Sequence, residues 1–206
     1  MKLAIFGSTG CTGRQLVTQA LEQGHEVTAF VRSPEKLDQK HEKLKVIKGN
    51  VLDLPSVERT IQGQDVVLCT IGTSPMDKSN LRANGTKTII RAMEKAGVNR
   101  FICQSSDGVG DSRSKMPFLY KYLIVPFMLR RAFADHEIQE SYIKESQLDW
   151  IIVRPTALTD GAYTGFYQHG DAVDNKTVKF KISRSDTADF MLKQVTDNNY
   201  LHKTPS

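Results

Sequence analysis

Short apolar runs alternate with amphipathic segments along the whole chain. Helical spacing of apolar residues predicts four helices, at Gly13–Gln23, Pro55–Gln62, Asn80–Lys95 and Ile138–Glu145. The apolar runs predict six strands, at Lys2–Phe6, Glu26–Val31, Leu44–Lys48, Val66–Ile71, Arg100–Gln104 and Trp150–Val153. Most of these runs are continuously apolar, which is typical of parallel strands buried on both faces. The alternation predicts an α/β fold with a doubly wound parallel sheet in the order 3-2-1-4-5-6.

The C-terminal part of the chain is less regular. Thr177–Ile182 predicts a short extra strand, and Asp186–Thr196 predicts a helix whose start is marked by Ser183 or Ser185. No repeat or linker divides the sequence. Residues 1–206 are therefore expected to form one domain with a small C-terminal substrate region.

An apolar stretch, Met116–Leu129, lies between the fifth and sixth predicted strands. It is too short to span a bilayer, and Pro117 and Pro126 are expected to interrupt any long helix. It belongs to a variable segment near residues 107–134, for which three interpretations are open: a lid over a substrate, a partner surface, or a contact with a membrane surface. We favour the lid.

Composition narrows the class of protein. The 206 residues include 28 Lys and Arg against 23 Asp and Glu, a formal net charge of +5, and 39% are apolar. The basic residues are dispersed without a nucleic-acid-binding motif, so an anionic small ligand is expected rather than nucleic acid. Three isolated cysteines indicate neither a disulfide framework nor zinc, and no metal site is predicted. A soluble cytoplasmic protein, monomeric or weakly homo-oligomeric, is expected.

A glycine-rich turn follows the first predicted strand and carries the strongest chemical pattern. It reads Gly7-Ser8-Thr9-Gly10-Cys11-Thr12-Gly13. Gly7 permits a tight turn, Gly10 lets a pyrophosphate approach the backbone, and Gly13 lets the helix pack close to the strand. The helix N-terminus then offers N–H groups to phosphate. The turn predicts a Rossmann-like dinucleotide site, with a purely structural turn as the alternative.

Basic residues follow the second predicted strand, where a site for NAD carries a carboxylate for the ribose hydroxyls. Arg32 and Ser33, with Lys36 one turn later, are predicted to bind the 2′-phosphate of NADP. A solvated surface arginine is the alternative. NADPH is accordingly expected to be preferred over NADH.

Polar and small residues also follow the third and fourth strands, at the edge where doubly wound folds bind ligands. Asn50, with Val51 beside it, is a candidate for adenine binding, and Gly72 in Ile71-Gly72-Thr73 would leave the ring space. Both are also ordinary turn residues.

These segments together resemble the atypical short-chain dehydrogenase/reductases of the NAD(P)H-binding, NmrA-like family, and within it the flavin reductase (biliverdin reductase B) type. The resemblance covers nearly the whole chain and rests on AIFGSTGCTG, EVTAFVRS, GNVLD, GQDVVLCTIGT, Asn84-Gly85, DWIIVRPTALTDGAYTG and ISRSDTADFML. Asn50 stands where the family pattern has aspartate.

The resemblance implies roles for particular residues. Residues of the adenosine and phosphate half would be Thr9, Gly10, Thr12, Gly13, Arg32, Lys36, Asn50, Ile71, Gly72 and Thr73. Ser105, Ser106, Pro155 and Thr156 would lie beside the nicotinamide. Ser106 is the candidate catalytic hydrogen-bond donor, and a serine satisfied by its own strand end is the alternative.

The Tyr-x-x-x-Lys pair of many short-chain dehydrogenases is missing, because Ile124, Pro126 and Ser146 follow Tyr120, Tyr122 and Tyr142 at that spacing. A planar, conjugated and anionic acceptor is therefore expected, a flavin, linear tetrapyrrole or quinone reduced by direct hydride transfer from NADPH. A non-catalytic NADP-binding redox sensor and an assembly factor that uses the fold as a scaffold are the alternatives.

Three further side chains have open roles. His136 and Glu140 are one helical turn apart and are suited to acid–base chemistry, but a solvated helix face is the favoured interpretation. Arg154 either anchors the end of the sixth strand or assists an anionic substrate, and we favour the anchor.

Overall fold

The computed structural model describes residues 1–74, 79–116, 118–170 and 180–206. Its central sheet has the strand order β3-β2-β1-β4-β5-β6, with every neighbouring pair parallel. The strands are β1 (Lys2–Phe6), β2 (Glu26–Val31), β3 (Leu44–Lys48), β4 (Val66–Cys69), β5 (Arg100–Gln104) and β6 (Asp149–Val153). The predicted fold class and strand order are confirmed.

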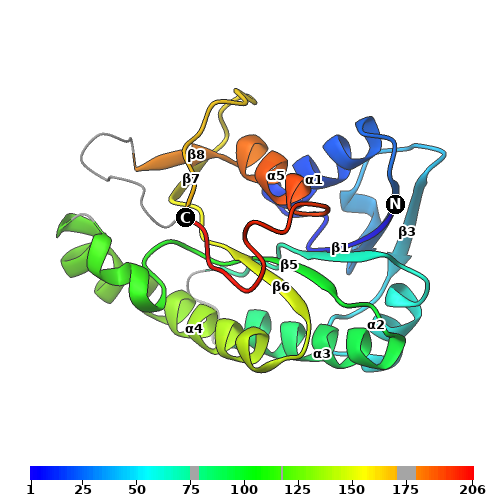
Figure 1. Cartoon of the computed structure of the whole chain (residues 1–206), viewed down its shortest axis with the longest axis horizontal. Helices are drawn as coiled ribbons and strands as arrows, with labels where there is room; N and C mark the ends of the chain where they lie inside the picture. The colour runs from blue at the N-terminus through cyan, green and yellow to red at the C-terminus, as the bar shows by residue number, and fades with distance from the viewer. Residues whose placement is uncertain (75–78, 117, 171–179) are drawn as a thin grey trace.

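Helices cover both faces of this sheet (Figure 1). One face carries α1 (Cys11–Glu22) and α5 (Arg184–Lys193), and the other carries α2 (Leu54–Ile61), α3 (Leu81–Ala96) and α4 (Arg130–Glu145). The described residues also form two short 3₁₀-helices, Pro34–Lys36 (η1) and Gly110–Lys115 (η2), and a π-helical segment, Tyr120–Leu129 (η3). The result is a three-layer α/β/α arrangement.

Two apolar clusters sandwich the sheet because residues of each strand point alternately to its two faces. Ala4 and Phe6 pack on the α2–α3–α4 side, whereas Leu3 and Ile5 pack on the α1–α5 side, and all four are fully buried. The edge strand β3 instead has exposed Lys45 and Lys48.

Helix ends follow the expected chemistry. The Asp53 carboxylate accepts from the Ser56 N–H at the start of α2, and the Ser183 hydroxyl accepts from the Asp186 N–H at the start of α5. Of the two serines predicted to mark the start of this helix, Ser183 is therefore the N-cap. Gly24, Gly63 and Gly97 follow the ends of α1, α2 and α3 and have φ of +81°, +73° and +69°, the left-handed conformation in which glycine commonly ends a helix.

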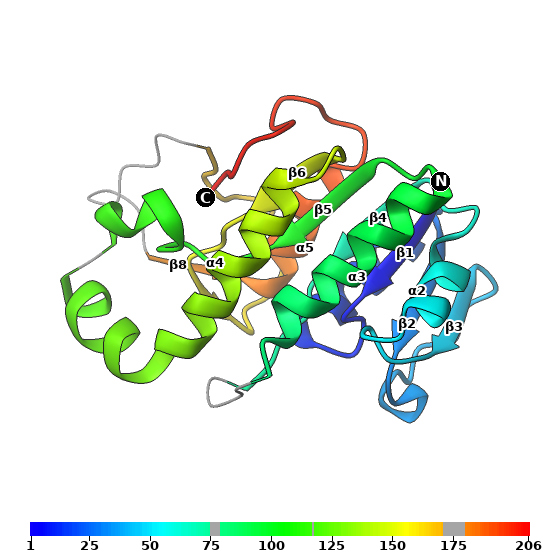
Figure 2. The same cartoon turned by 90° about the horizontal axis from the view of Figure 1, so that it is seen from below.

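The predicted start of the fourth helix was wrong. The helical run extends from residue 118 to residue 145 (Figure 2). Pro126 lies inside this run, in η3. The wider i→i+5 turn accommodates a residue that has no N–H and whose ring would clash in an α-helix. The predicted interruption at Pro126 is therefore replaced by a π-helical stretch, and Pro117 lies outside the described residues.

A small parallel sheet stands beside the main one. It pairs β7 (Ala157–Thr159) with β8 (Lys181–Ser183), so the extra strand predicted at Thr177–Ile182 overlaps β8, while its residues 177–179 lie outside the described residues. The C-terminal segment runs along the free edge of β6, where Lys203 and Pro205 accept from the N–H groups of Ile152 and Arg154.

Candidate functional site

The glycine turn between β1 and α1 is built by close backbone contacts. Gly7 has φ +87°, and a Cβ there would lie 2.5 Å from the Thr70 carbonyl oxygen at the end of β4. A Cβ on Gly13 would lie 2.1 Å from the Gly7 carbonyl oxygen. Only glycine at both positions allows α1 to begin directly against the strand end, which is the packing that the sequence predicted.

The N-terminus of α1 is open to an anion. Gly10 is its N-cap and supplies no side-chain acceptor, and the first turn contains no acidic residue. The N–H groups of that turn therefore combine with the helix dipole to favour a phosphate. Thr9 and Gly10 border this turn, Cys11 is exposed at the first helical position, and Thr12 is buried.

The loop after β2 approaches the same turn. Arg32 and Lys36 are exposed, and the half-buried Ser33 precedes η1 without a side-chain capping bond. Arg14, on the first turns of α1, connects the two segments: its Nη2 donates to the Lys36 carbonyl oxygen at 2.5 Å and its Nε to the Thr9 carbonyl oxygen at 3.2 Å. The structure thus gathers three cationic residues around the glycine turn.

Sequence reasoning missed Arg14. A basic residue immediately after a glycine-rich turn, on a helix that begins beside a basic loop, is the pattern that would have indicated it.

The strand-end residues after β3 and β4 have structural partners. The Asn50 side-chain oxygen accepts from the Leu52 N–H at 3.1 Å, the ordinary turn bond, while Asn50 itself is exposed and Val51 is buried. Ile71 and Thr73 are half-buried and Gly72 is exposed, with open space around its Cα.

A buried ion pair holds the loop after β4. The Arg82 guanidinium donates to the Thr73 hydroxyl at 2.6 Å and lies 3.4 Å from the Asp135 carboxylate. The Asp135 carboxylate also accepts from the backbone N–H groups of Arg82 and Ala83 at the start of α3. Asp135 on α4 therefore caps α3 and positions Ile71–Thr73 through Arg82.

The ends of β5 and β6 stay side by side beyond the strands. The Ser105 N–H donates to the Val153 carbonyl oxygen at 2.7 Å, and the Asp107 N–H donates to the Pro155 carbonyl oxygen at 2.9 Å. Ser105 and Pro155 are buried, whereas Ser106 and Thr156 are half-buried. The Ser106 hydroxyl donates to the Asp107 carbonyl oxygen at 3.2 Å, a bond at its own strand end.

A buried charge network lies behind these loops. Arg154, 1% exposed, donates from Nε and Nη2 to the two carboxylate oxygens of Glu140 at 2.9 and 2.7 Å. Asp111 accepts a further bond from Arg154, and the Ser105 hydroxyl donates to Glu140 at 2.8 Å. Burial would raise the pKa of Glu140, but the hydrogen bonds and charge of Arg154 outweigh it and hold that pKa below its usual value. Arg154 is thus the anchor that we favoured.

The favoured interpretation of His136 and Glu140 was wrong, because both side chains are buried rather than solvated. The His136 ring nitrogen Nδ1 lies 3.0 Å from the Gln139 side-chain oxygen. Burial, helped by the nearby charge of Arg82, lowers the pKa of His136 to about 4. The imidazole is therefore neutral and structural.

Asp107, next to Ser106, is a buried carboxyl group that sequence reasoning did not single out. Burial raises its pKa, against the opposing effect of the Gly108 N–H and the Ser112 hydroxyl. Nothing in the residue pattern distinguishes it from a turn aspartate.

One tyrosine does have a lysine partner in the folded chain. The Lys193 ammonium donates to the Tyr167 hydroxyl at 3.0 Å, and that hydroxyl donates to the Asp189 carboxylate at 2.5 Å. Burial and Asp189 raise the pKa of Tyr167 to about 12, which is opposite to what a proton donor needs. The carbonyl oxygen of Gln194, the residue after Lys193, accepts from Arg100 at the start of β5. The Tyr167–Lys193 pair therefore lies toward the amino-terminal ends of the strands, whereas the glycine turn lies at their carboxyl-terminal ends.

No group of three or more His, Cys, Asp or Glu side chains that could hold a metal ion occurs in the described ranges. Within those ranges, too, no helix has the length and apolar character to cross a membrane.

A doubly wound sheet with an open helix N-terminus over a glycine turn defines a dinucleotide-binding oxidoreductase fold. The model of the NAD(P)H-binding family matches residues 7–198, and the chain belongs to that family.

Individual proteins also resemble the chain over most of its length. An uncharacterized chloroplastic protein of Arabidopsis thaliana is 29% identical over 173 residues, which are 80% of this chain and 61% of that protein. The chain thus spans less than two thirds of that relative's length.

Two solved structures share the fold. ChuY from Escherichia coli O157:H7, described as an anaerobilin reductase, has a TM-score of 0.81 at 24% identity, over 100% of this chain and 96% of its own. A short-chain dehydrogenase/reductase from Veillonella parvula, solved in complex with NADP, has a TM-score of 0.81 at 18% identity, over 99% of this chain and 92% of its own.

Proposed function

We propose that this protein is an NADPH-dependent reductase of a planar conjugated acceptor, a flavin, linear tetrapyrrole or quinone. The observation that carries the proposal is the half-buried pair Ser106 and Thr156, which stands on the same sheet edge as the glycine turn. A dinucleotide whose pyrophosphate rests on that turn extends across the switch point toward these two residues.

The residues present fit NADPH. The open α1 N-terminus suits the pyrophosphate, and Arg32 and Lys36 are exposed beside it for the 2′-phosphate. The proposed cofactor residues are Gly7, Thr9, Gly10, Cys11, Thr12, Gly13, Arg32, Ser33, Lys36, Asn50, Val51, Ile71, Gly72, Thr73, Ser105, Pro155 and Thr156. To this set we add Arg14 as a positioning residue, because it connects the glycine turn to the loop that carries Lys36.

The protein's own contribution to the reaction is orientation. When bound, NADPH supplies the hydride. Ser106 donates a hydrogen bond to the acceptor or to the carboxamide, exchanging its bond to the Asp107 carbonyl. Ser105 serves as a support, because Glu140 already engages its hydroxyl. A conjugated acceptor suits such a site because it can take its proton from water rather than from a tuned tyrosine.

The fold relationship to a protein described as an anaerobilin reductase supports a conjugated acceptor. In this chain the segment of residues 107–134 follows the strand that carries Ser106, and its inward residues Val109 and Met116 pack together with Phe133. We assign the inner part of that segment to the wall of the acceptor site.

The test is acceptor-dependent oxidation of NADPH with riboflavin phosphate, biliverdin and menadione, alongside calorimetric binding of NADPH. Ser106→Ala should lower kcat/KM for the accepted compound by about 2- to 10-fold, the value of one neutral hydrogen bond. Ser114→Ala is the matched control, because Ser114 is an exposed serine whose hydroxyl donates to the nearby Asp111 carbonyl oxygen. Tight NADPH binding with no turnover of any acceptor would overturn the reductase in favour of a sensor.

A further inference from the structure

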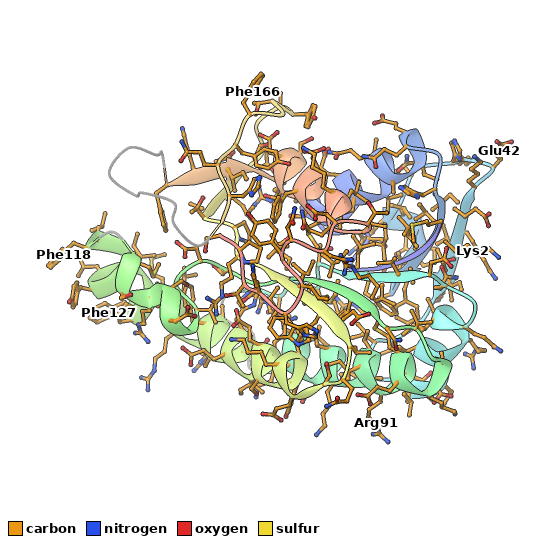
Figure 3. All side chains as sticks on the ribbon, in the orientation of Figure 1. Lys2, Glu42, Arg91, Phe118, Phe127 and Phe166 are labelled. Carbon is orange, nitrogen blue, oxygen red and sulfur yellow. The ribbon has the colours of Figure 1, made fainter. Side chains whose placement is uncertain are left out.

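The far end of the helical run carries an exposed apolar surface, which we call the apolar tip. Its members are Phe118, Leu119, Tyr122, Leu123, Phe127 and Met128, and each side chain is at least half exposed. Phe127 is 81% exposed and Phe118 75%. Figure 3 shows both at the outermost end of the molecule, pointing away from the sheet. An apolar surface of this kind on a water-soluble fold indicates a binding surface.

The tip is attached to the body by its opposite side. Val125 is 2% exposed and packs with Val109, Met116 and Phe133 in a separate small core. The segment therefore has an inward side that belongs to the fold and an outward side that does not. A lid role for the inward side leaves the outward phenylalanines unexplained.

Charge is segregated around the tip. Residues 112–134 contain five Lys and Arg residues and no Asp or Glu, which equals the +5 net charge of the whole chain. Arg113, Arg130 and Arg131 are exposed, and no ion pair found among the described residues includes them. The apolar surface is thus bordered by unneutralised cations.

A groove of about 490 Å³ joins the two features. Its lining is Arg113, Val125, Pro126, Phe127, Arg130, Phe133, Ala134 and Glu137. Two arginines face a single carboxylate, Glu137, so the lining is net cationic, and its other five residues are apolar. This combination suits an amphiphile with an anionic headgroup and a hydrocarbon chain.

We propose that the apolar tip binds the surface of a bilayer containing anionic phospholipid. Phe118, Leu119, Phe127 and Met128 would enter the region between headgroups and acyl chains while Arg113, Arg130 and Arg131 meet lipid phosphates. Charge complementarity favours this occupant over a second copy of the chain, because two facing tips would bring these same cations together. The inference is independent of the reductase proposal.

The test is flotation of the purified chain with vesicles of phosphatidylcholine alone and of phosphatidylcholine with phosphatidylglycerol in equal parts. We expect binding only to the second, and weaker binding as salt is raised. Equal binding to both compositions, or binding to neither, would overturn the proposal.

Two variants separate the apolar and the charged contributions. Phe118→Ser with Phe127→Ser should weaken vesicle binding at least about 100-fold, since two phenylalanines no longer leave water. Arg130→Gln with Arg131→Gln should weaken it about 30-fold, from roughly 1 kcal/mol per charge. All four side chains are exposed, so the fold is expected to persist, as thermal unfolding would check.

Matched controls lie on other faces. Phe166→Ser alters an equally prominent phenylalanine, 92% exposed, and Arg91→Gln removes an exposed arginine of α3; Figure 3 shows both away from the tip. Both controls should bind vesicles like the parent chain. Control variants that weaken binding as much as the tip variants would contradict the assignment. A dimer in sedimentation that Phe127→Ser dissolves, without vesicle binding, would identify self-association instead.

Discussion

At the scale of single residues, Arg32 is the group on which cofactor choice is expected to depend. Its exposed guanidinium follows β2 without a neighbouring carboxylate in the Val31-Arg32-Ser33 sequence. We expect NADPH to bind at least about 10-fold more tightly than NADH, from a charged hydrogen bond of about 1.5–3 kcal/mol. Arg32→Asp should abolish or reverse the preference, as calorimetric dissociation constants for both cofactors would show.

Lys40→Asp is the control for this experiment, since it makes the same kind of charge change at an exposed position in the loop before β3. It should leave the ratio of the two dissociation constants unchanged. If Arg32→Asp also leaves the ratio of dissociation constants unchanged, another residue binds the 2′-phosphate of NADPH, and Arg14→Gln would be tested next.

His136 is a second residue whose environment predicts a measurable effect. Its pKa is about 4 in the folded chain against an ordinary 6.5, so the unfolded chain binds the proton more readily. The unfolding free energy is therefore unaffected by His136 above pH 6.5 and decreases as the pH falls from 6.5 toward 4, because the unfolded chain takes up a proton that the folded chain does not. The loss at pH 5 should be about 2 kcal/mol of unfolding free energy.

Urea unfolding of the parent chain and of His136→Asn at pH 7 and pH 5 would measure that contribution. His136→Asn should show a smaller loss between the two pH values, whereas His41→Asn, at an exposed position, should behave like the parent. An identical pH dependence in all three proteins would mean that His136 is not held neutral by the fold.

At the scale of elements, α4 connects the loops of the candidate site. Glu140 joins α4 to β6 through Arg154 and to the end of β5 through Ser105. Glu140→Gln should destabilise the fold by about 3–5 kcal/mol, because it removes the buried partner of the Arg154 charge and leaves only the exposed carboxylate of Asp111. Denaturant unfolding would measure this loss. Glu137→Gln, an exposed change on the same helix, should cost less than about 0.5 kcal/mol.

The Glu140 pair also predicts a pH dependence. Because its pKa is lowered by folding, the stability it contributes is present above the ordinary glutamate range and is lost as the pH falls through the folded value. Acid unfolding of Glu140→Gln should therefore be shallower than that of the parent. Curves of equal slope would show that Arg154 does not depend on this carboxylate.

At the scale of the whole molecule, the C-terminal segment covers the last strand of the sheet. Lys203 and Pro205 accept from the N–H groups of Ile152 and Arg154, so removing residues 203–206 would leave both donors unpaired. At about 1–3 kcal/mol for each buried unsatisfied group, the truncation should cost roughly 2–6 kcal/mol of unfolding free energy. Lys203→Ala keeps the backbone acceptors and should change urea unfolding little. If the truncated chain is as stable as the parent, the two hydrogen bonds from β6 to the C-terminal segment do not contribute to stability.

The sequence alone determined the sheet and the glycine turn. Strands such as Lys2–Phe6 and Glu26–Val31 coincide with their predictions because a parallel strand that is buried on both faces is mostly apolar beyond its exposed first residue. The roles of Gly7 and Gly13 in the turn were equally readable, since a backbone that approaches within 2.5 Å of a would-be Cβ admits only glycine.

Only the tertiary structure decided the roles of α4 and the residues behind the site. The inward positions of α4 are Phe133, Asp135, His136, Gln139, Glu140 and Ile143, and the polar ones read along the chain as a solvated face. The partner of Asp135, Arg82, is 53 positions away in the sequence, and the partner of Glu140, Arg154, is 14 positions away. Arg14 and the Lys36 carbonyl that it contacts are 22 positions apart. A polar side chain can be buried only where another satisfies it, and that pairing exists only once the chain has folded.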